Sequence, residues 1–307
     1  MTGSTRRTRR QPWRRLALLA PLLLASAPPA VSPTSGADEA IVVTGSIERE
    51  EAVRDFVDTV TIETSDQIAK FATPVCPAAF GLPAAHNEVI TARVRQIADY
   101  IGIGAAGDAC RPNVVIVVAE RGAEFVDRLH EERPNLFSTM ELIDIRRVMR
   151  LAGPVRAWQV VEQRGADGRP MDWIEVGLER RIRPSLSGVM PSITQRPTRQ
   201  DLALSFIVFD LEAIEGLTLL QIADHAAMRA FARTGTAAMP TRRSILGLFA
   251  DRAAGAAPAV ELTNWDAAYL SALYRTGNTV SAHRQRSSIA RTMRRELDSH
   301  SEPPQEQ

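Results

Sequence analysis

The residue types best suited to acid–base chemistry gather in one part of the sequence. Asp224 and His225 are adjacent, Asp210 and Glu212 precede them, and Asp266 lies in a later helical segment. A histidine that is paired with a carboxylate can serve as a general base. The alternative is that His225 is an ordinary histidine of the core or the surface. These residues therefore define one candidate function, a hydrolase with its active site around Asp210, Asp224 and His225.

No other pattern completes a set of catalytic or metal-binding residues. None of the remaining histidines has a second ligand three or four residues further along the chain; they are His86, His130, His283 and His300. The segment SLSGVM lacks the G-x-S-x-G pattern of a serine hydrolase. The glycines of IGIGAAG follow a predicted helix, whereas a dinucleotide-binding loop lies between a strand and a helix. We therefore expect no metal and no cofactor.

The segment that contains Asp224 and His225 is itself predicted to be a helix of the core. It reads GLTLLQIADHAAMRAF and runs from Gly216 to Phe231. Its apolar residues recur every three or four positions and would form one stripe, made of Leu219, Ile222, Ala223, Ala226 and Ala230. Small alanine side chains allow another element to pack closely against such a stripe. Asp224 and His225 would flank the stripe and could hydrogen-bond to neighbouring elements.

Two segments after this helix, RRSILGLF and ELTNWDAAYLSALYRTGN, resemble the tail of many secreted zincins, the metallopeptidases with an H-E-x-x-H helix. The resemblance extends over residues 200–278. It places Ala223 and Ala227 where the two zinc-binding histidines would stand, and Asp224 where the catalytic glutamate would stand. Alanine cannot coordinate zinc. The resemblance thus implies a zincin-like scaffold without its metal, similar to uncharacterised secreted bacterial proteins with a degenerate version of this helix.

The N-terminus has the pattern of a signal peptide. Several arginines up to Arg15 precede an apolar segment, Leu16 to Leu24, and the small residues Ala25-Ser26-Ala27 follow. We predict a signal peptide over residues 1–27 and hence a periplasmic or secreted protein that is not transmembrane after signal removal. The alternative is an uncleaved anchor, although the apolar segment is shorter than the roughly 20 residues that span a bilayer.

Export affects how the two cysteines are interpreted. In an oxidising compartment Cys76 and Cys110 are expected to form a disulfide, because two cysteines allow only one pairing. The alternative is a metal site with two thiolate ligands, but no further histidine or cysteine stands at ligand spacing near them.

The remaining pattern predicts a flexible lead-in over 28–39, one globular α+β domain over 40–297, and a disordered tail over 298–307. Helical periodicity and capping signals predict helices over 87–101, 122–131, 138–151, 216–231, 243–249, 264–274 and 281–297. Apolar or β-branched runs predict strands over 41–45, 60–63, 113–118, 155–161, 172–178 and 203–209. The continuous apolar run at 113–118 is typical of a central strand, and the turn residues 165–168 predict that 155–161 and 172–178 pair as a hairpin. The expected fold is zincin-like, with a mixed sheet packed with helices and a helical C-terminal part.

The chain as a whole is nearly neutral, but its basic residues are unevenly distributed. The 37 basic and 36 acidic residues give a net charge of +1, which argues against a nucleic-acid partner. The last predicted helix, by contrast, is rich in arginine. It could contact an anionic surface or an envelope partner through Arg284, Arg291, Arg294 and Arg295. The alternative is a solvated helix that docks on the domain through a narrow apolar stripe.

The sequence favours a secreted or periplasmic protein without catalytic activity, a zincin-like binding or structural domain of the cell envelope. Its ligand or protein partner is not indicated. The competing interpretation is the hydrolase described above.

Overall fold

The computed structural model describes residues 36–107, 109–137, 140–176, 181–185, 192, 194–235 and 243–299. The chain divides into two compact units, residues 1–43 and residues 44–307. Of the first unit only 36–43 are described, as the beginning of a helix, and the following account concerns the second unit. The predicted signal peptide lies outside the described residues.

A four-stranded mixed sheet lies at the centre of the second unit, with the strand order β1-β2-β6-β3. Its strands are β1 (Pro77–Phe80), β2 (Val114–Ala119), β3 (Val155–Gly165) and β6 (Thr198–Asp210). The strands β1, β2 and β6 are parallel, and β3 runs antiparallel to β6 at one edge. The α+β class and the central position of the apolar run at 113–118 are therefore confirmed.

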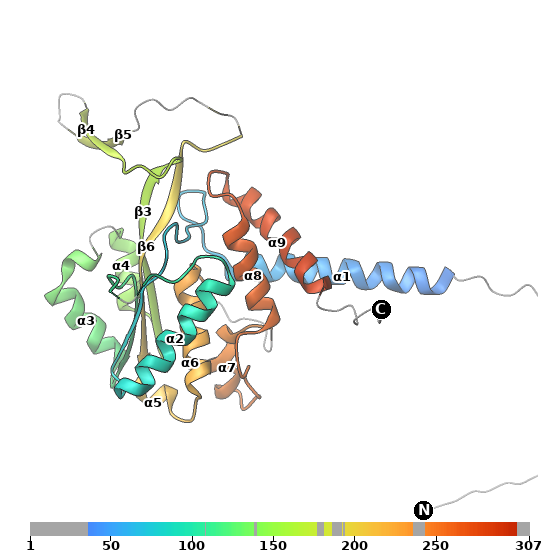
Figure 1. Cartoon of the computed structure of the whole chain (residues 1–307), viewed down its shortest axis with the longest axis horizontal. Coiled ribbons are helices and arrows are strands. Elements are labelled where there is room, and N and C mark those ends of the chain that lie inside the picture. The colour runs from blue at the N-terminus through green and yellow to red at the C-terminus, as the bar shows by residue number, and fades with distance from the viewer. Residues whose placement is uncertain are drawn as a thin grey trace, which may run out of the picture. The chain divides into compact units, whose positions relative to one another are not determined.

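Helices cover both faces of this sheet (Figure 1). The helices of the described residues are α1 (Gly36–Val60), α2 (Ala84–Tyr100), α3 (Gly122–Glu132), α4 (Leu142–Met149), α5 (Leu211–Ile214), α6 (Leu219–Phe231), α7 (Leu248–Ala253), α8 (Asn264–Arg275) and α9 (Ala282–Ser299), with 3-10 turns at Pro134–Phe137 and Ile245–Gly247. The helices α3 and α4 lie on one face, and α2 and α6 lie on the other. The helices α8 and α9 and the second half of α1 pack beyond α6, in the same hydrophobic core.

The strand β2 shows why the sheet is covered on both faces. Val114 and Ile116 point into the larger core, together with residues of α2, α6 and α8. Val117 points into a smaller core beneath α3 and α4. In that smaller core the Trp158 ring stacks between two phenylalanine rings, with centroid distances of 5.4 Å to Phe137 and 4.7 Å to Phe206.

The predicted strand over 41–45 is wrong, because these residues belong to α1. The β-branched run there is short and continues into a segment with helical spacing of apolar residues. Val53, Phe56, Val57 and Val60 are all buried against the core, and this helical face determines the local structure. Residues 60–63 likewise form no strand, although Thr61 makes an isolated bridge to the chain after α6.

The predicted hairpin between 155–161 and 172–178 is also wrong. The strand β4 (Asp172–Val176) pairs with β5 (Arg181–Ser185) in a separate two-stranded sheet, and β3 pairs with β6. The turn at Gly165 does form, since the Gly168 amide donates to the Gly165 carbonyl. Local turn chemistry was therefore read correctly, but the choice of pairing partner depends on residues distant in the sequence.

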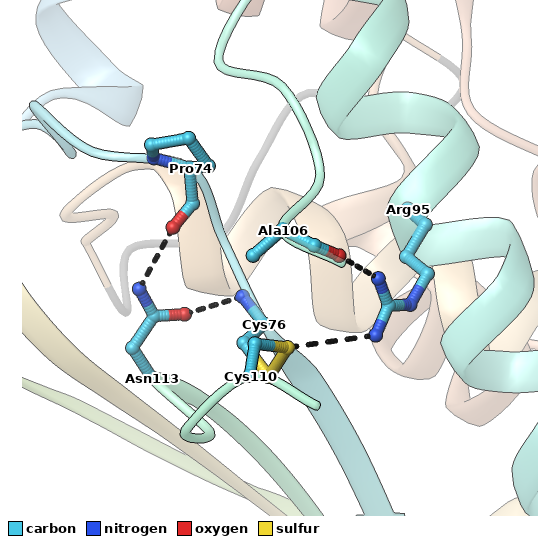
Figure 2. Close-up of a disulfide and its surroundings, with 6 residues drawn as sticks. All are labelled: Pro74, Cys76, Arg95, Ala106, Cys110 and Asn113. Atoms are coloured by element: carbon cyan, nitrogen blue, oxygen red, sulfur yellow. Dashed lines mark hydrogen bonds between the residues drawn. A yellow bond between two sulfur atoms is a disulfide. The ribbon is translucent and has the colours of Figure 1, made fainter. Parts of the chain in front are cut away.

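Cys76 and Cys110 form a disulfide, as predicted. It joins the start of β1 to the loop before β2 (Figure 2). The Asn113 side chain accepts from the Cys76 amide at 2.7 Å and donates to the Pro74 carbonyl at 3.2 Å. Arg95 of α2 donates to the Cys110 sulfur at 3.7 Å. The disulfide thus lies in a hydrogen-bonded corner that holds α2 against the sheet.

Candidate functional site

The helix α6 is enclosed by the rest of the unit. It begins at a capping box, in which Thr218 and Gln221 bind each other's backbone amide groups. From Gln221 to Met228 every residue is buried. The Ser205 hydroxyl of β6 donates to the Ala230 carbonyl at 2.8 Å, which holds the helix against the sheet.

Ala223 and Ala227 are both fully buried in the larger core. The predicted apolar stripe is confirmed at Ile222, Ala226 and Ala230, which are buried in the same core. The absence of long side chains lets α6 pack closely against its neighbours. The two positions that the resemblance aligns with zinc ligands therefore contribute to core packing.

Asp224 connects three segments. Its carboxylate binds the guanidinium of Arg93 on α2 through two contacts, Nε–Oδ1 at 2.6 Å and Nη2–Oδ2 at 3.1 Å. It also accepts a hydrogen bond from the Leu262 amide, in the segment before α8, at 2.5 Å. The Asp224 side chain is 0% exposed, and that of Arg93 is 21% exposed. The bond to Asp224 raises the pKa of Arg93. This carboxylate is thus fully occupied by structural contacts.

His225 lies between aromatic rings, with centroid distances of 5.7 Å to Phe209 and 5.1 Å to Phe249. It is 1% exposed, and its Nδ1 has no hydrogen-bond partner among the described residues. Burial, together with the nearby charge of Arg229, holds the pKa of His225 well below its usual range. The imidazole is therefore neutral at neutral pH and has almost no contact with solvent.

Asp210 is the last residue of β6 and binds the beginning of α3. Its Oδ1 accepts from the Gly122 amide at 2.6 Å and lies 3.3 Å from Nη1 of Arg156. A Cβ at position 122 would lie 2.6 Å from the same oxygen, so this close approach requires glycine. A carboxylate at the positive end of a helix is favourable. Asp210 thus has a structural partner, although its side chain stays 28% exposed.

Asp266 is fully buried at the beginning of α8. Its carboxylate accepts from the Ser244 hydroxyl at 2.5 Å, the Ile245 amide at 2.7 Å, and the amide and hydroxyl of Thr263 at 3.2 and 2.9 Å. Burial outweighs these bonds and raises the pKa of Asp266 to about 6. The predicted capping box of Thr263 and Asp266 is confirmed.

The candidate acid–base residues do not all share one cleft. Asp210, Glu212 and Phe249 line a cleft of about 720 Å³ at the end of β6. Asp224, His225 and Asp266 are not among its lining residues. Phe249 contacts the His225 ring and also lines the cleft. The structure therefore brings Asp210 to an open surface and leaves Asp224 and His225 in the interior.

Two residues with large structural effects were not singled out from the sequence. Arg93 is one of many arginines, and its partner lies 131 residues away. Lys70 is the chain's only lysine. Its ammonium donates to the last carbonyls of α8, at 3.2 Å to both Leu273 and Tyr274 and by a shorter contact to Thr276. Burial lowers the pKa of Lys70 to about 8. The only sign of this structural role in the sequence was that the chain has a single lysine.

The described part of the chain contains no group of three or more histidine, cysteine, aspartate or glutamate side chains that could hold a metal ion. No helix in that same part is both long and apolar enough to cross a membrane. Comparison with protein-family models, with curated proteins and with solved structures finds no match for this chain.

Proposed function

We propose that this chain is an exported, non-catalytic domain with a zincin-like scaffold, and that it has a binding or structural role in the cell envelope. The observation that carries the proposal is the environment of α6. Ala223 and Ala227 stand where zinc ligands are expected and are fully buried, and Asp224, at the position of the catalytic glutamate, is bound by Arg93 and Leu262.

Contacts between the two tail segments support the scaffold part of the proposal. Ser244 belongs to the segment RRSILGLF, and Asp266 belongs to the segment with LTNWD. They bind each other directly beside α6, with the hydroxyl and carboxylate oxygens 2.5 Å apart. The residues that carry the resemblance are thus the ones that hold α8 and the turn at Ile245 together. Such a motif can persist for structural reasons after the metal ligands are lost.

The edge of the sheet supports a binding role. The strand β3 is an edge strand of the sheet, since it pairs with β6 alone among the described strands. An exposed strand edge can accept a further extended segment from a partner. The cleft that Asp210 and Phe249 line lies at one end of the same sheet.

Peptide cleavage tests the non-catalytic proposal against the alternative of a hydrolase around Asp210, Asp224 and His225. The purified protein is incubated with a mixed peptide library, with and without added zinc, and the products are identified by mass spectrometry. We expect no cleavage. Cleavage that is lost in His225→Ala and Asp210→Asn, and kept in the control His283→Ala, would establish the hydrolase instead.

Cell fractionation tests export separately. We expect the protein in the periplasmic or secreted fraction, with a mature N-terminus after residue 27 or within the lead-in. Recovery in the cytoplasm with Met1 intact would contradict this part of the proposal.

A further inference from the structure

A second cavity lies between α1 and α9. These two helices are far apart in the sequence and lie against each other (Figure 1). The cavity is a groove of about 510 Å³. Charged residues form much of its lining, which consists of Glu50, Val53, Arg54, Val57, Asp58, His283, Arg286, Ser287, Ala290, Arg291 and Arg294. Four arginines face two carboxylates there, so the groove has an excess of positive charge.

One glutamate is shared by two of these arginines. The carboxylate of Glu50 binds Arg294 of α9 at 2.7 Å through one oxygen and Arg54 of α1 through the other. A single negative charge thus faces two guanidinium groups. The side chains of Arg54 and Arg294 are 62% and 39% exposed, so an anion from the solvent can reach both arginines.

The other arginines of the groove differ in their partners. Arg286 is balanced by two acidic residues, since it lies 2.6 Å from Glu63 and 3.6 Å from Asp58. Arg291 is exposed and forms no hydrogen bond or ion pair with any residue in the described ranges. The unbalanced charge of the groove therefore lies around Arg54, Arg291 and Arg294.

We infer that this groove binds a ligand with a phosphate group, held by Arg54, Arg291 and Arg294. Guanidinium groups bind phosphate oxygens in a bidentate manner and stay charged at all physiological pH values. Ala290 is partly exposed in the same lining and can contact an alkyl group attached to the phosphate, whereas Val53 and Val57 beneath it are almost fully buried. The inference is independent of export and of the resemblance to zincins.

Calorimetric titration of the purified protein with n-hexyl phosphate tests the inference. We expect saturable binding that Arg291→Glu weakens by about tenfold or more, because a charge-assisted contact is replaced by repulsion. The matched control is Arg295→Glu, which makes the same charge change on an exposed arginine of α9 outside the groove lining. It should leave the affinity within about twofold. Equal weakening by both variants, or no binding by the wild type, would overturn the inference.

Glu50→Gln provides a second test, in which the affinity for the ligand should rise. Removing the carboxylate frees Arg54 and Arg294 for the ligand, so the affinity for n-hexyl phosphate should rise several-fold. Circular dichroism and thermal melting verify that each variant is folded. A folded Glu50→Gln protein that binds n-hexyl phosphate more weakly than the wild type would contradict the proposed site.

Vesicle sedimentation then identifies the source of the phosphate group. Binding to phosphatidylglycerol vesicles, but not to phosphatidylcholine vesicles, with loss in Arg291→Glu and retention in Arg295→Glu, would assign the groove to a lipid headgroup. Hexyl phosphate binding without vesicle binding would assign it to a free phosphorylated ligand. Vesicle binding that both variants reduce equally would indicate attraction to the whole helix surface and would overturn the assignment to the groove.

Discussion

At the residue scale, Asp224 joins α2, α6 and the segment before α8 through one carboxylate. Removing one partner of a buried ion pair leaves the other charge buried and unpaired, which destabilises the folded state. Arg93 keeps some solvent contact, which moderates the cost. The contribution of Asp224 is therefore expected to appear in folding rather than in catalysis.

Asp224→Ala is predicted to lower the free energy of unfolding by about 2 to 4 kcal/mol. Urea denaturation measures the change. The double variant Asp224→Ala/Arg93→Met should lose less than the sum of the two single variants, because the pair acts as a unit. Additive losses would show that the pair is not coupled in solution.

Lys70 makes the stability depend on pH. Its pKa is lowered from 10.5 to about 8 by burial, so above pH 8 the unfolded chain binds more protons than the folded one. Stability should therefore rise with pH, by about 2 kcal/mol between about pH 8 and 9.5. This window lies below the usual tyrosine pKa of about 10.

Lys70→Met should abolish this rise in urea denaturation at each pH. The same rise in the variant would mean that another group is responsible. Because Lys70 is the only lysine, amine labelling adds a second readout. The lysine is 8% exposed, and labelling should be slow in the native protein and fast in urea.

At the element scale, the beginning of α8 depends on Asp266, which accepts hydrogen bonds from Thr263 of its own cap and from Ser244 and Ile245 of the preceding turn. Asp266→Ala leaves several buried donors unsatisfied and is predicted to cost about 3 kcal/mol. Thr263→Ala removes the cap hydroxyl but keeps the bonds from Ser244 and Ile245 to Asp266, and it should cost about 1 kcal/mol.

Urea denaturation measures both losses, and amide hydrogen exchange at Ile245 locates the effect. Exchange there should accelerate in Asp266→Ala, because the Ile245 amide donates to this carboxylate. Unchanged exchange at Ile245 would contradict the assigned contact.

The elements that could be predicted are those whose signals are local. The helices α2, α8 and α9 have apolar periodicity or capping residues, and β2 is a continuous apolar run. The pairing of β4 with β5 could not be predicted, because any short strand can pair with several others. At the candidate site the packing of Ala223, Ala226 and Ala230 was predicted, whereas the partner of Asp224 is distant in sequence and was not.

At the scale of the whole molecule, the disulfide closes a loop between residues 34 positions apart. In the chain-entropy model such a cross-link contributes about 4 kcal/mol. The double variant Cys76→Ser/Cys110→Ser should lose a comparable amount in urea denaturation. A thiol assay on the denatured, unreduced protein should find no reactive thiol, and two reactive thiols would refute the disulfide.

The central claim is that α6 serves as a core helix and holds no catalytic metal, because alanines stand at the two positions that the proposed resemblance to zincins assigns to zinc ligands. Elemental analysis of the untagged protein, purified without chelators and dialysed against zinc, tests this claim most directly. We predict no bound zinc in the wild type or in His225→Ala. Stoichiometric zinc in the wild type that is lost in His225→Ala would contradict the claim.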